Sequence, residues 1–405
     1  MSVAFDPTSD DFVQNPYPHY ARLREAPAPT HFAPVDMHML ARADWIEAVA
    51  TNPAMVRSLD GHRSEAEAEA ARRAVNWHDM PFHQRLIQRS LLDSDGPDHR
   101  RLRRLVFAAF QGEGVARHRA FVEALVDDVL EEARERGTVD FAAQVAARIP
   151  GRVIARFLGA PVEDADAMAA WTVPVVAFFD LDRSAAKKAA AETATRQFHD
   201  YLDDLARERE RRPHDDLISA MVADFARGAY ASRDEFIATC MLILMAGHGS
   251  SIDAMGAGLS TLLDHPDALA RLRREPACME AAVQEMIRFE SPLPFFHRHA
   301  LEDVAIGGVD YPAGTTFGLL YGAANRDPAA FGKPDVFDID RTPNRHLAFG
   351  RGAHLCLGNH LARMTMGIVF TQLLARFATI ERTGPTVWRQ GLSVRGPASL
   401  PVELA

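Results

Sequence analysis

The chain has 405 residues, of which 47 % are apolar and 25 % are charged, and its formal net charge is −10. This composition excludes a disordered, collagen-like or coiled-coil chain, and the acidic balance argues against a general nucleic-acid binder. Its three cysteines, Cys240, Cys278 and Cys356, are scattered along the chain. They are too few for a disulfide framework and indicate a reducing compartment.

Neither the N-terminus nor the longest apolar run predicts export or membrane insertion. The first residues, MSVAFDPTSDDF, carry acids where a signal peptide would carry a basic region and then an apolar one. The longest apolar run, FIATCMLILMAG, has 12 residues and is shorter than the roughly 18 that a bilayer span requires. We therefore expect a buried core helix there and a soluble, cytoplasmic protein.

Helical periodicity dominates the chain up to about Arg288. One example is an apolar stripe that ends near Gly137, formed by Phe121, Val122, Leu125, Val126, Val129 and Leu130. Short strands with turns between them are expected at about 303–321 and again at 387–404. Because linkers, repeats and alternating βα units are missing, residues 1–405 are predicted to form one mainly α domain with small β-sheets.

The segment HLAFGRGAHLCLGNHLARM, residues 346–364, carries the clearest chemical signal. Glycines at 350, 352 and 358 surround Cys356, and a helix is expected to begin just after it. Glycines let the backbone approach a large group, and a helix N-terminus stabilises a thiolate, which is a strong metal ligand. A zinc site is the weaker interpretation, because His354 and Cys356 lack a second ligand pair at a recognisable spacing.

This segment resembles the haem-binding signature of the cytochromes P450, the haem-thiolate monooxygenases. The matching positions are Phe349, Gly350, Gly352, His354, Cys356 and Gly358. The resemblance implies a single-domain, mainly α fold with haem b buried between a long central helix and the cysteine-ligand loop. It implies that Cys356 is the axial iron ligand, and that Phe349, His354 and Gly358 also contact the cofactor.

A second motif of the same family precedes this segment. Glu285 and Arg288, in QEMIRFESP, are three residues apart and can pair on one helix face. By itself this spacing also fits an ordinary exposed salt bridge. The family buries this structural pair and adds an arginine from the loop before the haem signature, and Arg341 in FDIDRTP resembles that third member.

Basic residues upstream and downstream resemble the family's contacts to the haem propionates. These are His99 and Arg103 in DSDGPDHRRLRRLVFAAF, together with Arg298 and, by its motif position, His354. The neighbouring Arg100, Arg101 and Arg104 fit either a solvated helix face or a positive patch for an acidic ferredoxin.

The apolar helix departs from the family pattern at Ala246-Gly247-His248-Gly249-Ser250-Ser251. In the family this stretch crosses the oxygen-binding face of the haem, so that Ala246 and Gly247 lie against it, and it usually carries an acid followed by threonine. Here Gly249 stands at the acid position, while Ser250 keeps a hydroxyl that can pass protons, with Ser251 beside it. Three explanations remain open for how protons reach bound oxygen. The proton relay runs through His248, Asp253 or water, or the substrate itself supplies the proton-handling group. Otherwise the protein performs an atypical reaction. A serine-hydrolase elbow is rejected, because the second glycine of that motif is missing.

Substrate contacts are expected from dispersed positions, namely Phe179, Leu293, Phe295, Phe296 and Val394, although ordinary core packing would also explain these residues. The resemblance implies a monooxygenase that inserts one oxygen atom of O2 into a small hydrophobic, and by conjecture aromatic, substrate by hydroxylation or O-dealkylation. Because no flavin or iron–sulfur segment is present, electrons are expected from a ferredoxin and an NAD(P)H-dependent reductase, with no nucleic-acid or membrane partner. Two alternatives are a peroxide-using or otherwise atypical haem-thiolate oxidation, motivated by Gly249, and a non-catalytic haem-binding sensor.

Overall fold

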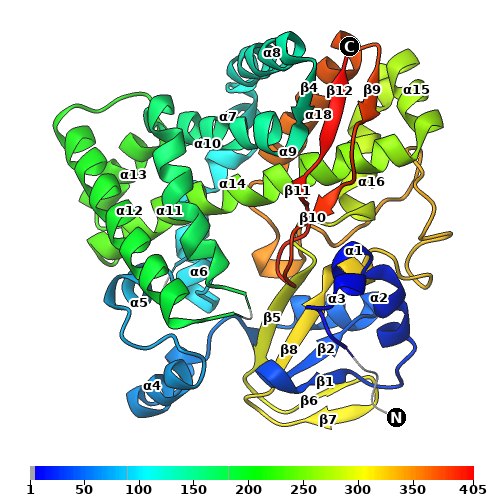
Figure 1. Ribbon diagram of the computed structural model, residues 1–405. Helices are drawn as coiled ribbons and strands as arrows, with labels where there is room; N and C mark the ends of the chain where they lie inside the picture. Colours follow the sequence, from blue (N-terminus) through cyan, green and yellow to red (C-terminus); the bar gives the residue numbers. More distant parts are fainter. Residues whose placement is uncertain (1–4, 89, 181) are drawn as a thin grey trace. The chain divides into compact units, whose positions relative to one another are not determined.

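The computed structural model describes residues 5–88, 90–180 and 182–405, and it is dominated by helices with four small sheets in that described part (Figure 1). By internal contacts the chain divides into two compact units. The first unit takes residues 1–55, 119–149 and 250–405, and the second takes residues 56–118 and 150–249. The predicted fold class is confirmed. Since both units are assembled from separated segments, no linker divides the chain, and the interpretation of residues 1–405 as one domain stays a prediction.

The first unit contains most of the strands. Its helices and 3-10 turns are α1 (Asp10–Gln14), α2 (Tyr17–Arg24), η1 (Ala33–Val35), α3 (Ala43–Thr51), α8 (Arg119–Arg136), α9 (Phe141–Gln144), η4 (Ala146–Arg148), α15 (Pro266–Arg274), η6 (Pro276–Cys278), α16 (Met279–Phe289), α17 (Tyr321–Ala324), η7 (Gly352–His354) and α18 (Asn359–Arg376). Its strands are β1 (Thr30–Phe32), β2 (Met37–Leu40), β3 (Met55–Val56, whose last residue belongs to the second unit), β4 (Thr138–Asp140), β5 (Phe295–Ala300), β6 (Val304–Ile306), β7 (Val309–Tyr311), β8 (Thr316–Leu320), β9 (Ile380–Arg382), β10 (Val387–Trp388), β11 (Pro397–Ser399) and β12 (Pro401–Leu404).

In the described residues of the second unit the regular elements are helices and 3-10 turns, apart from the end of β3. Its elements are η2 (Asp60–His62), α4 (Glu65–Ala74), α5 (Pro81–Leu86), α6 (Gly96–Phe107), η3 (Ala108–Phe110), α7 (Gly112–Ala116), α10 (Pro150–Leu158), η5 (Val162–Asp164), α11 (Ala165–Ala177), α12 (Ala185–Arg211) and α13 (Leu217–Ala226). The helix α14 (Arg233–Asp264) contributes its first part to this unit and its second part to the first unit. Helices α11 and α12 pack side by side, as the green ribbons of Figure 1 show.

The main sheet has the strand order β1-β2-β8-β5-β3, in which β2 and β8 run parallel. Strands β5 and β8 run antiparallel, with Phe295 opposite Leu320 and His299 opposite Thr316. Three strands join in the order β4-β12-β9, and β6-β7 and β10-β11 form two-stranded ribbons. The strands expected at 303–321 and 387–404 are therefore confirmed, whereas β1 and β2 lie where the periodicity indicated helices.

The helix predicted from the 121–130 stripe is confirmed as α8, which buries Val122, Val126 and Val129. It ends as expected at Gly137, whose φ is +70° and whose N–H bonds to the carbonyl oxygens of Ala133 and Arg134. A left-handed residue costs glycine little, which is why the chain turns there.

Among the described residues, α14 is the single helix long and apolar enough by composition to cross a membrane. Of its most apolar window, 61 % is buried inside the protein. That burial is typical of a core helix, which agrees with the prediction for the FIATCMLILMAG run.

Candidate functional site

Cys356 lies in a tight loop, residues 347–358, that includes the 3-10 turn η7 and leads into α18. Two glycines of this loop, Gly350 and Gly352, have φ angles of +73° and +71°, which residues with a Cβ rarely adopt. The N–H of Gly350 donates to the Leu347 carbonyl at 2.8 Å, and the N–H of Cys356 donates to the Phe349 carbonyl at 2.8 Å. Backbone hydrogen bonds therefore fix where the sulfur of Cys356 is presented.

The neighbours of this loop hold it in place from both ends. A Cβ placed on Gly352 would lie 2.5 Å from the carbonyl oxygen of Ala50, at the end of α3, so only glycine fits there. On the other side, Asn359 Nδ2 donates to the Cys356 carbonyl at 2.7 Å. Asn359 is also the first residue of α18, with Gly358 at the N-cap. The positive end of this helix stabilises a thiolate three residues before it.

This loop is the one of the three cysteine environments that fits an axial thiolate. Cys240 is fully buried within α14 with its Sγ 4.0 Å from the Met221 Sδ, and burial raises the pKa of its thiol. Cys278 lies in the 3-10 turn η6, with its Sγ 3.8 Å from a carboxylate oxygen of Glu275. In the described part of the chain, no three His, Cys, Asp or Glu side chains gather as metal ligands, which argues against the zinc interpretation.

Glu285 and Arg288 pair inside α16, and both side chains are fully buried. Two parallel bonds of 2.7 Å join the guanidinium of Arg288 to the carboxylate of Glu285. Arg341 Nε lies 3.1 and 3.2 Å from the two oxygens of the same carboxylate, so the predicted third member is in contact with the pair. The carboxylate also accepts the N–H of Asp338 at 2.9 Å and Asn344 Nδ2 at 3.1 Å. A buried carboxylate with this many donors is a satisfied one.

The buried pair is linked to the cysteine loop through Asn325. Arg288 donates to the Asn325 carbonyl at 2.7 Å, and the side-chain oxygen of Asn325 accepts the Leu347 N–H at 2.6 Å. Leu347 is the residue whose carbonyl oxygen accepts the Gly350 N–H. The pair and the cysteine loop therefore share a hydrogen-bond framework, which gives Glu285 and Arg288 a positioning role in this site.

The four predicted propionate partners are divided between the two units. In the first unit, Arg298 on β5 is buried and donates to the His297 carbonyl at 2.8 Å, and His354 lies half-buried in η7. In the second unit, His99 is buried and Arg103 half-buried, four residues apart on α6. The roles of these residues toward a propionate stay predictions.

The basic segment around Arg103 is less positive than its sequence indicates. Arg101 forms a two-pronged ion pair with Glu235, with N···O distances of 2.6 and 2.8 Å. Arg100 and Arg104 remain exposed on α6. Any docking patch for an acidic partner on this helix would therefore rest on these two residues.

The middle of α14 is less buried than the stretches on either side of it. Residues 243–245 and 252–262 are buried, whereas Ala246 is exposed and Gly247, Gly249, Ser250 and Ser251 are half-buried. A Cβ on Gly247 would lie 2.9 Å from Ile154, whereas a Cβ on Gly249 would meet no atom within 4 Å. An accessible stretch on an otherwise buried apolar helix is what a cofactor or substrate face requires, and Gly249 has room for a side chain.

Asp253 lies one turn beyond Ser250 and is the nearest carboxylate on this helix. It is buried, and Arg389 Nε donates to its Oδ1 at 2.8 Å. The backbone at Gly396 approaches closely, because a Cβ there would lie 2.4 Å from the Asp253 Cβ. Burial raises the pKa of Asp253 to about 6, and the charge of Arg389 opposes that shift. Asp253 can therefore hold a proton near neutral pH.

The predicted substrate contacts separate into different surroundings. Phe295 and Phe296 are neighbours on β5, so their side chains point to opposite faces of the sheet. Phe296 packs against the core cluster that contains Tyr321, with ring centres 6.3 Å apart. The core-packing interpretation thus explains Phe296, whereas Phe295 and the half-buried Leu293 stay predicted contacts.

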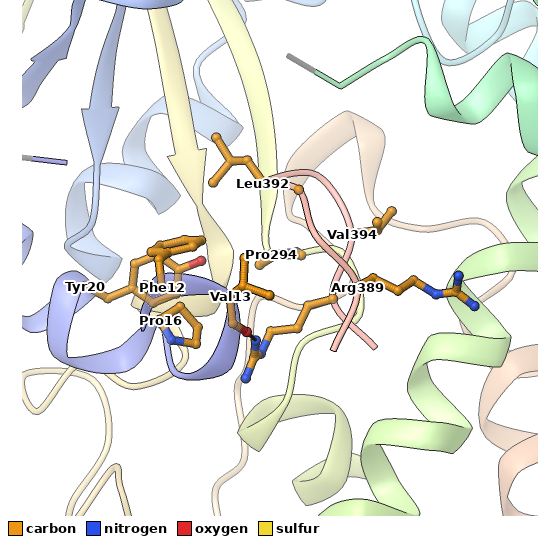
Figure 2. A pocket seen from close by; sticks show the side chains of 10 residues that line it. Phe12, Val13, Pro16, Tyr20, Pro294, Arg389, Leu392 and Val394 are labelled. Carbon is orange, nitrogen blue, oxygen red and sulfur yellow. Dashed lines mark hydrogen bonds between the residues drawn. The ribbon is translucent and has the colours of Figure 1, made fainter. Parts of the chain in front are cut away.

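Val394 lines a shallow cavity in the first unit with about 240 Å³ of empty space, which is open to solvent. Figure 2 shows Phe12, Pro16 and Tyr20 on one side of this cavity, with Leu392 on the loop that also carries Val394. The participation of the N-terminal helices was not predicted, since nothing in the local pattern of residues 12–20 indicates which segment they contact.

Phe179 lies in the second unit, beside a cluster that the sequence did not reveal. Its ring centre is 6.3 Å from that of Trp77 and 6.2 Å from that of His83. Arg183 lies over the Trp77 ring, with its guanidinium carbon 4.8 Å from the ring centre. His83 and Arg183 are 100 residues apart in the chain, and only the packing of α5 on α12 brings them together.

The family described as Cytochrome P450 matches residues 164–390 of this chain. The chain is 34 % identical over 411 residues to a 6-deoxyerythronolide B hydroxylase from Saccharopolyspora erythraea, with all of both proteins covered. It is also 34 % identical over 409 residues to a vitamin D(3) 25-hydroxylase from Pseudonocardia autotrophica, covering 98 % of this chain and 95 % of that protein.

Solved structures agree with these relatives over the whole length. The structure of CalO2 superposes with a TM-score of 0.91 at 29 % identity, covering 100 % of this chain and 99 % of that one. A complex of P450BioI with an acyl carrier protein superposes with a TM-score of 0.89 at 29 % identity, covering 98 % and 100 %.

Proposed function

The chain belongs to the cytochrome P450 family and is a haem-thiolate monooxygenase, and we propose that it inserts one atom of dioxygen into a small hydrophobic substrate through a haem held by Cys356. Proteins of this family bind iron protoporphyrin IX through a cysteine thiolate. The observation that carries the assignment to Cys356 is its loop, in which two glycines of positive φ and the N-terminus of α18 present the sulfur.

When bound, haem supplies the reductive activation of dioxygen. The protein's own contribution at Cys356 is positioning, because the carbonyl of Phe349 and the side chain of Asn359 fix the backbone on both sides of the sulfur. The helix end at α18 favours the anionic form of the ligand. Both hydrogen bonds use the backbone N–H and C=O of Cys356 and not its sulfur. The backbone is therefore fixed while the sulfur stays available as a ligand.

Ser250 is proposed to handle protons on the oxygen-binding side. Its hydroxyl can accept and donate a hydrogen bond at once, which is what a proton relay requires. Gly249 supplies no acid, so the carboxylate nearest in the helix is that of Asp253. With its pKa raised to about 6, Asp253 exchanges a proton near neutral pH and is the proposed acid behind Ser250.

Electrons are proposed to come from a ferredoxin and an NAD(P)H-dependent reductase. The exposed Arg100 and Arg104 on α6 are the residues of the basic segment that can meet an acidic partner. The relatives are named for chemically distant substrates, 6-deoxyerythronolide B and vitamin D(3), so the proposal stops at a hydrophobic substrate. A cytoplasmic location is part of the same proposal.

The first test is the carbon monoxide difference spectrum of the reduced protein, compared among wild type, Cys356→Ser and the control Cys278→Ser. We expect a thiolate-type, red-shifted Soret band for wild type and for the Cys278 variant, and loss of that band for the Cys356 variant. An imidazole-type band in wild type, or an unchanged band in Cys356→Ser, would reject the assignment. A turnover with reductase and ferredoxin that yields oxygenated product excludes a non-catalytic haem sensor.

A peroxide-driven oxidation is the second candidate, and the observation that favours it is the missing acid at Gly249. It predicts product with hydrogen peroxide at rates comparable to those of the reductase-supported reaction. If peroxide only bleaches the haem, the second candidate is rejected and the monooxygenase proposal stands.

A further inference from the structure

Three buried N–H donors without partners lie on neighbouring side chains of the second unit. They are Nε1 of Trp77, Nε2 of His83 and Nε of Arg183, and each is buried without a hydrogen-bond partner. The rings of Trp77 and His83 lie 5.6 Å apart between centres, and the Arg183 guanidinium carbon lies 4.8 Å from the centre of the Trp77 ring. Burying one unsatisfied donor is costly, so three in one cluster call for an acceptor that completes them.

The protonation of His83 follows from its surroundings. Gln88 Nε2 lies 3.2 Å from Nδ1 of His83. We assign the Gln88 amide as the donor to Nδ1, and in the tautomer that matches this assignment Nε2 carries the hydrogen. Burial, together with the nearby charge of Arg183, lowers the pKa of His83 to about 3. His83 is therefore a neutral donor that adds no charge to the cluster.

Arg183 supplies the positive charge among these three donors. Burial lowers its pKa and the charge of Asp180 opposes that shift, so the guanidinium stays charged. Indole and guanidinium groups donate hydrogen bonds and accept none, and with the hydrogen of His83 on Nε2 none of these three donors accepts from another. The charge of Asp180 acts on Arg183, but the three N–H groups still lack an acceptor, and a carboxylate, which accepts several hydrogen bonds at once, matches them.

Apolar side chains surround the donors. Met80 and Phe178 are fully buried, Trp77 packs against them, and Phe179 is half-buried beside the ring of His83. Trp77, Phe179 and Arg183 keep part of their surface exposed, so the edge of the cluster borders solvent while its three N–H groups are buried. An apolar body attached to the carboxylate would thus meet aromatic rings.

The cluster rests on a fixed backbone. The N–H groups of Phe82 and His83, at the start of α5, donate at 2.9 and 3.0 Å to the two carboxylate oxygens of Glu192 on α12. Asn76 Nδ2 donates to the Arg183 carbonyl at 2.7 Å, which ties the segment before α5 to the one before α12. The donors are therefore preorganised, which lowers the entropic cost of binding a ligand.

We propose that Trp77, His83 and Arg183 form a subsite that binds the carboxylate of an amphipathic ligand, with its apolar body against Phe178 and Phe179. In one respect the proposal rests on the proposed function, because it takes this ligand to be the substrate of the monooxygenase. It narrows the substrate class from hydrophobic molecules to hydrophobic acids.

The test measures binding of dodecanoate and of 1-dodecanol to the haem-loaded protein by titration calorimetry. The two probes share one chain and differ in the carboxylate, so the ratio of their dissociation constants isolates the contribution of the subsite. The variants are Arg183→Gln and His83→Phe, where the second keeps an aromatic ring without the donor. The control is Arg85→Gln, which removes a cation of α5 that pairs with Asp234 outside the cluster.

We expect wild type and the Arg85 variant to bind dodecanoate at least about tenfold more tightly than dodecanol, and both cluster variants to lose most of that preference. Equal affinity for the two probes in wild type, absence of binding, or an unchanged preference in both cluster variants would overturn the proposal. Calorimetry requires no turnover, and the carbon monoxide spectrum of the same samples reports haem ligation. Failure of the subsite is therefore distinguishable from failure of the monooxygenase assignment.

Discussion

Asp253 should make the protein less stable as the pH rises through the weakly acidic range. Its carboxyl titrates near the ordinary value of 3.8 in the unfolded chain, whereas burial raises the folded-state pKa to about 6. Between these two values the folded protein binds the proton more tightly than the unfolded chain does, so raising the pH removes stability. The whole shift corresponds to about 3 kcal/mol, of which about 1.4 kcal/mol is lost between about pH 5 and pH 7.5.

The assay compares wild type with Asp253→Asn by urea unfolding at about pH 5 and about pH 7.5. Asparagine keeps the size of the side chain but does not titrate. The constant cost of losing the Arg389 ion pair cancels when the two pH values are subtracted. We expect the stability of wild type relative to the variant to fall by about 1.4 kcal/mol from the lower to the higher pH. The same difference at both pH values, or a rise with pH, would refute the reasoning and remove Asp253 as a proton carrier.

Three further predictions concern the buried ion pair of α16, the cysteine loop and the acid position of α14. Glu285→Gln leaves Arg288 buried beside a neutral partner and should lower the free energy of unfolding by about 3–5 kcal/mol. The control is Glu131→Gln, which removes the charge from an exposed pair with Arg134 and should leave the free energy of unfolding unchanged. Gly352→Ala should lower the haem content per chain, because its Cβ would clash with the backbone of α3, whereas Gly367→Ala, in open space within α18, should retain haem and gain up to about 1 kcal/mol. Because Asp253 is the proposed acid behind Ser250, Gly249→Glu should leave unchanged or lower the fraction of NAD(P)H consumption that yields product, and a raised fraction would show that the missing acid at 249 limits turnover.

The parts of the site that the sequence predicted are those defined by short spacing. The glycine pattern around Cys356 and the i,i+3 pair of Glu285 and Arg288 depend on neighbours in the chain, so they could be read locally. Arg341 was placed through the family resemblance, and the structure shows it on the same carboxylate. Strand β2, by contrast, is a four-residue polar and apolar mixture whose partner β8 lies about 280 residues further along. A strand that short carries too little periodicity to be distinguished from a helix.

The donor cluster shows a different limit of prediction. The loop with Trp77 was predicted from the sequence only as one of several aromatic segments that could line the substrate pocket, and His83 and Arg183 carried no motif. What singles these three side chains out is that each has a buried N–H group without a hydrogen-bond acceptor. Lack of a partner is a property of packing, because it depends on every side chain that could have reached the donor. Sequence patterns indicate which groups are present, but they do not indicate which groups stay unsatisfied.

The missing acid of α14 and the carboxylate of Asp253 have a common explanation in helix geometry. Residues 249 and 253 are four apart, so they lie on the same face of the helix, about one turn from each other. This face of the helix therefore still carries a carboxylate, one turn beyond Gly249. At residue 253 the carboxylate is buried beneath the backbone of Gly396 and contacts Arg389, and this environment raises its pKa to about 6. A solvent-accessible acid at 249 would titrate near its ordinary value and be ionised at neutral pH. The buried position thus gives the helix an acid whose pKa, at about 6, lies closer to neutral pH than the ordinary value of 3.8.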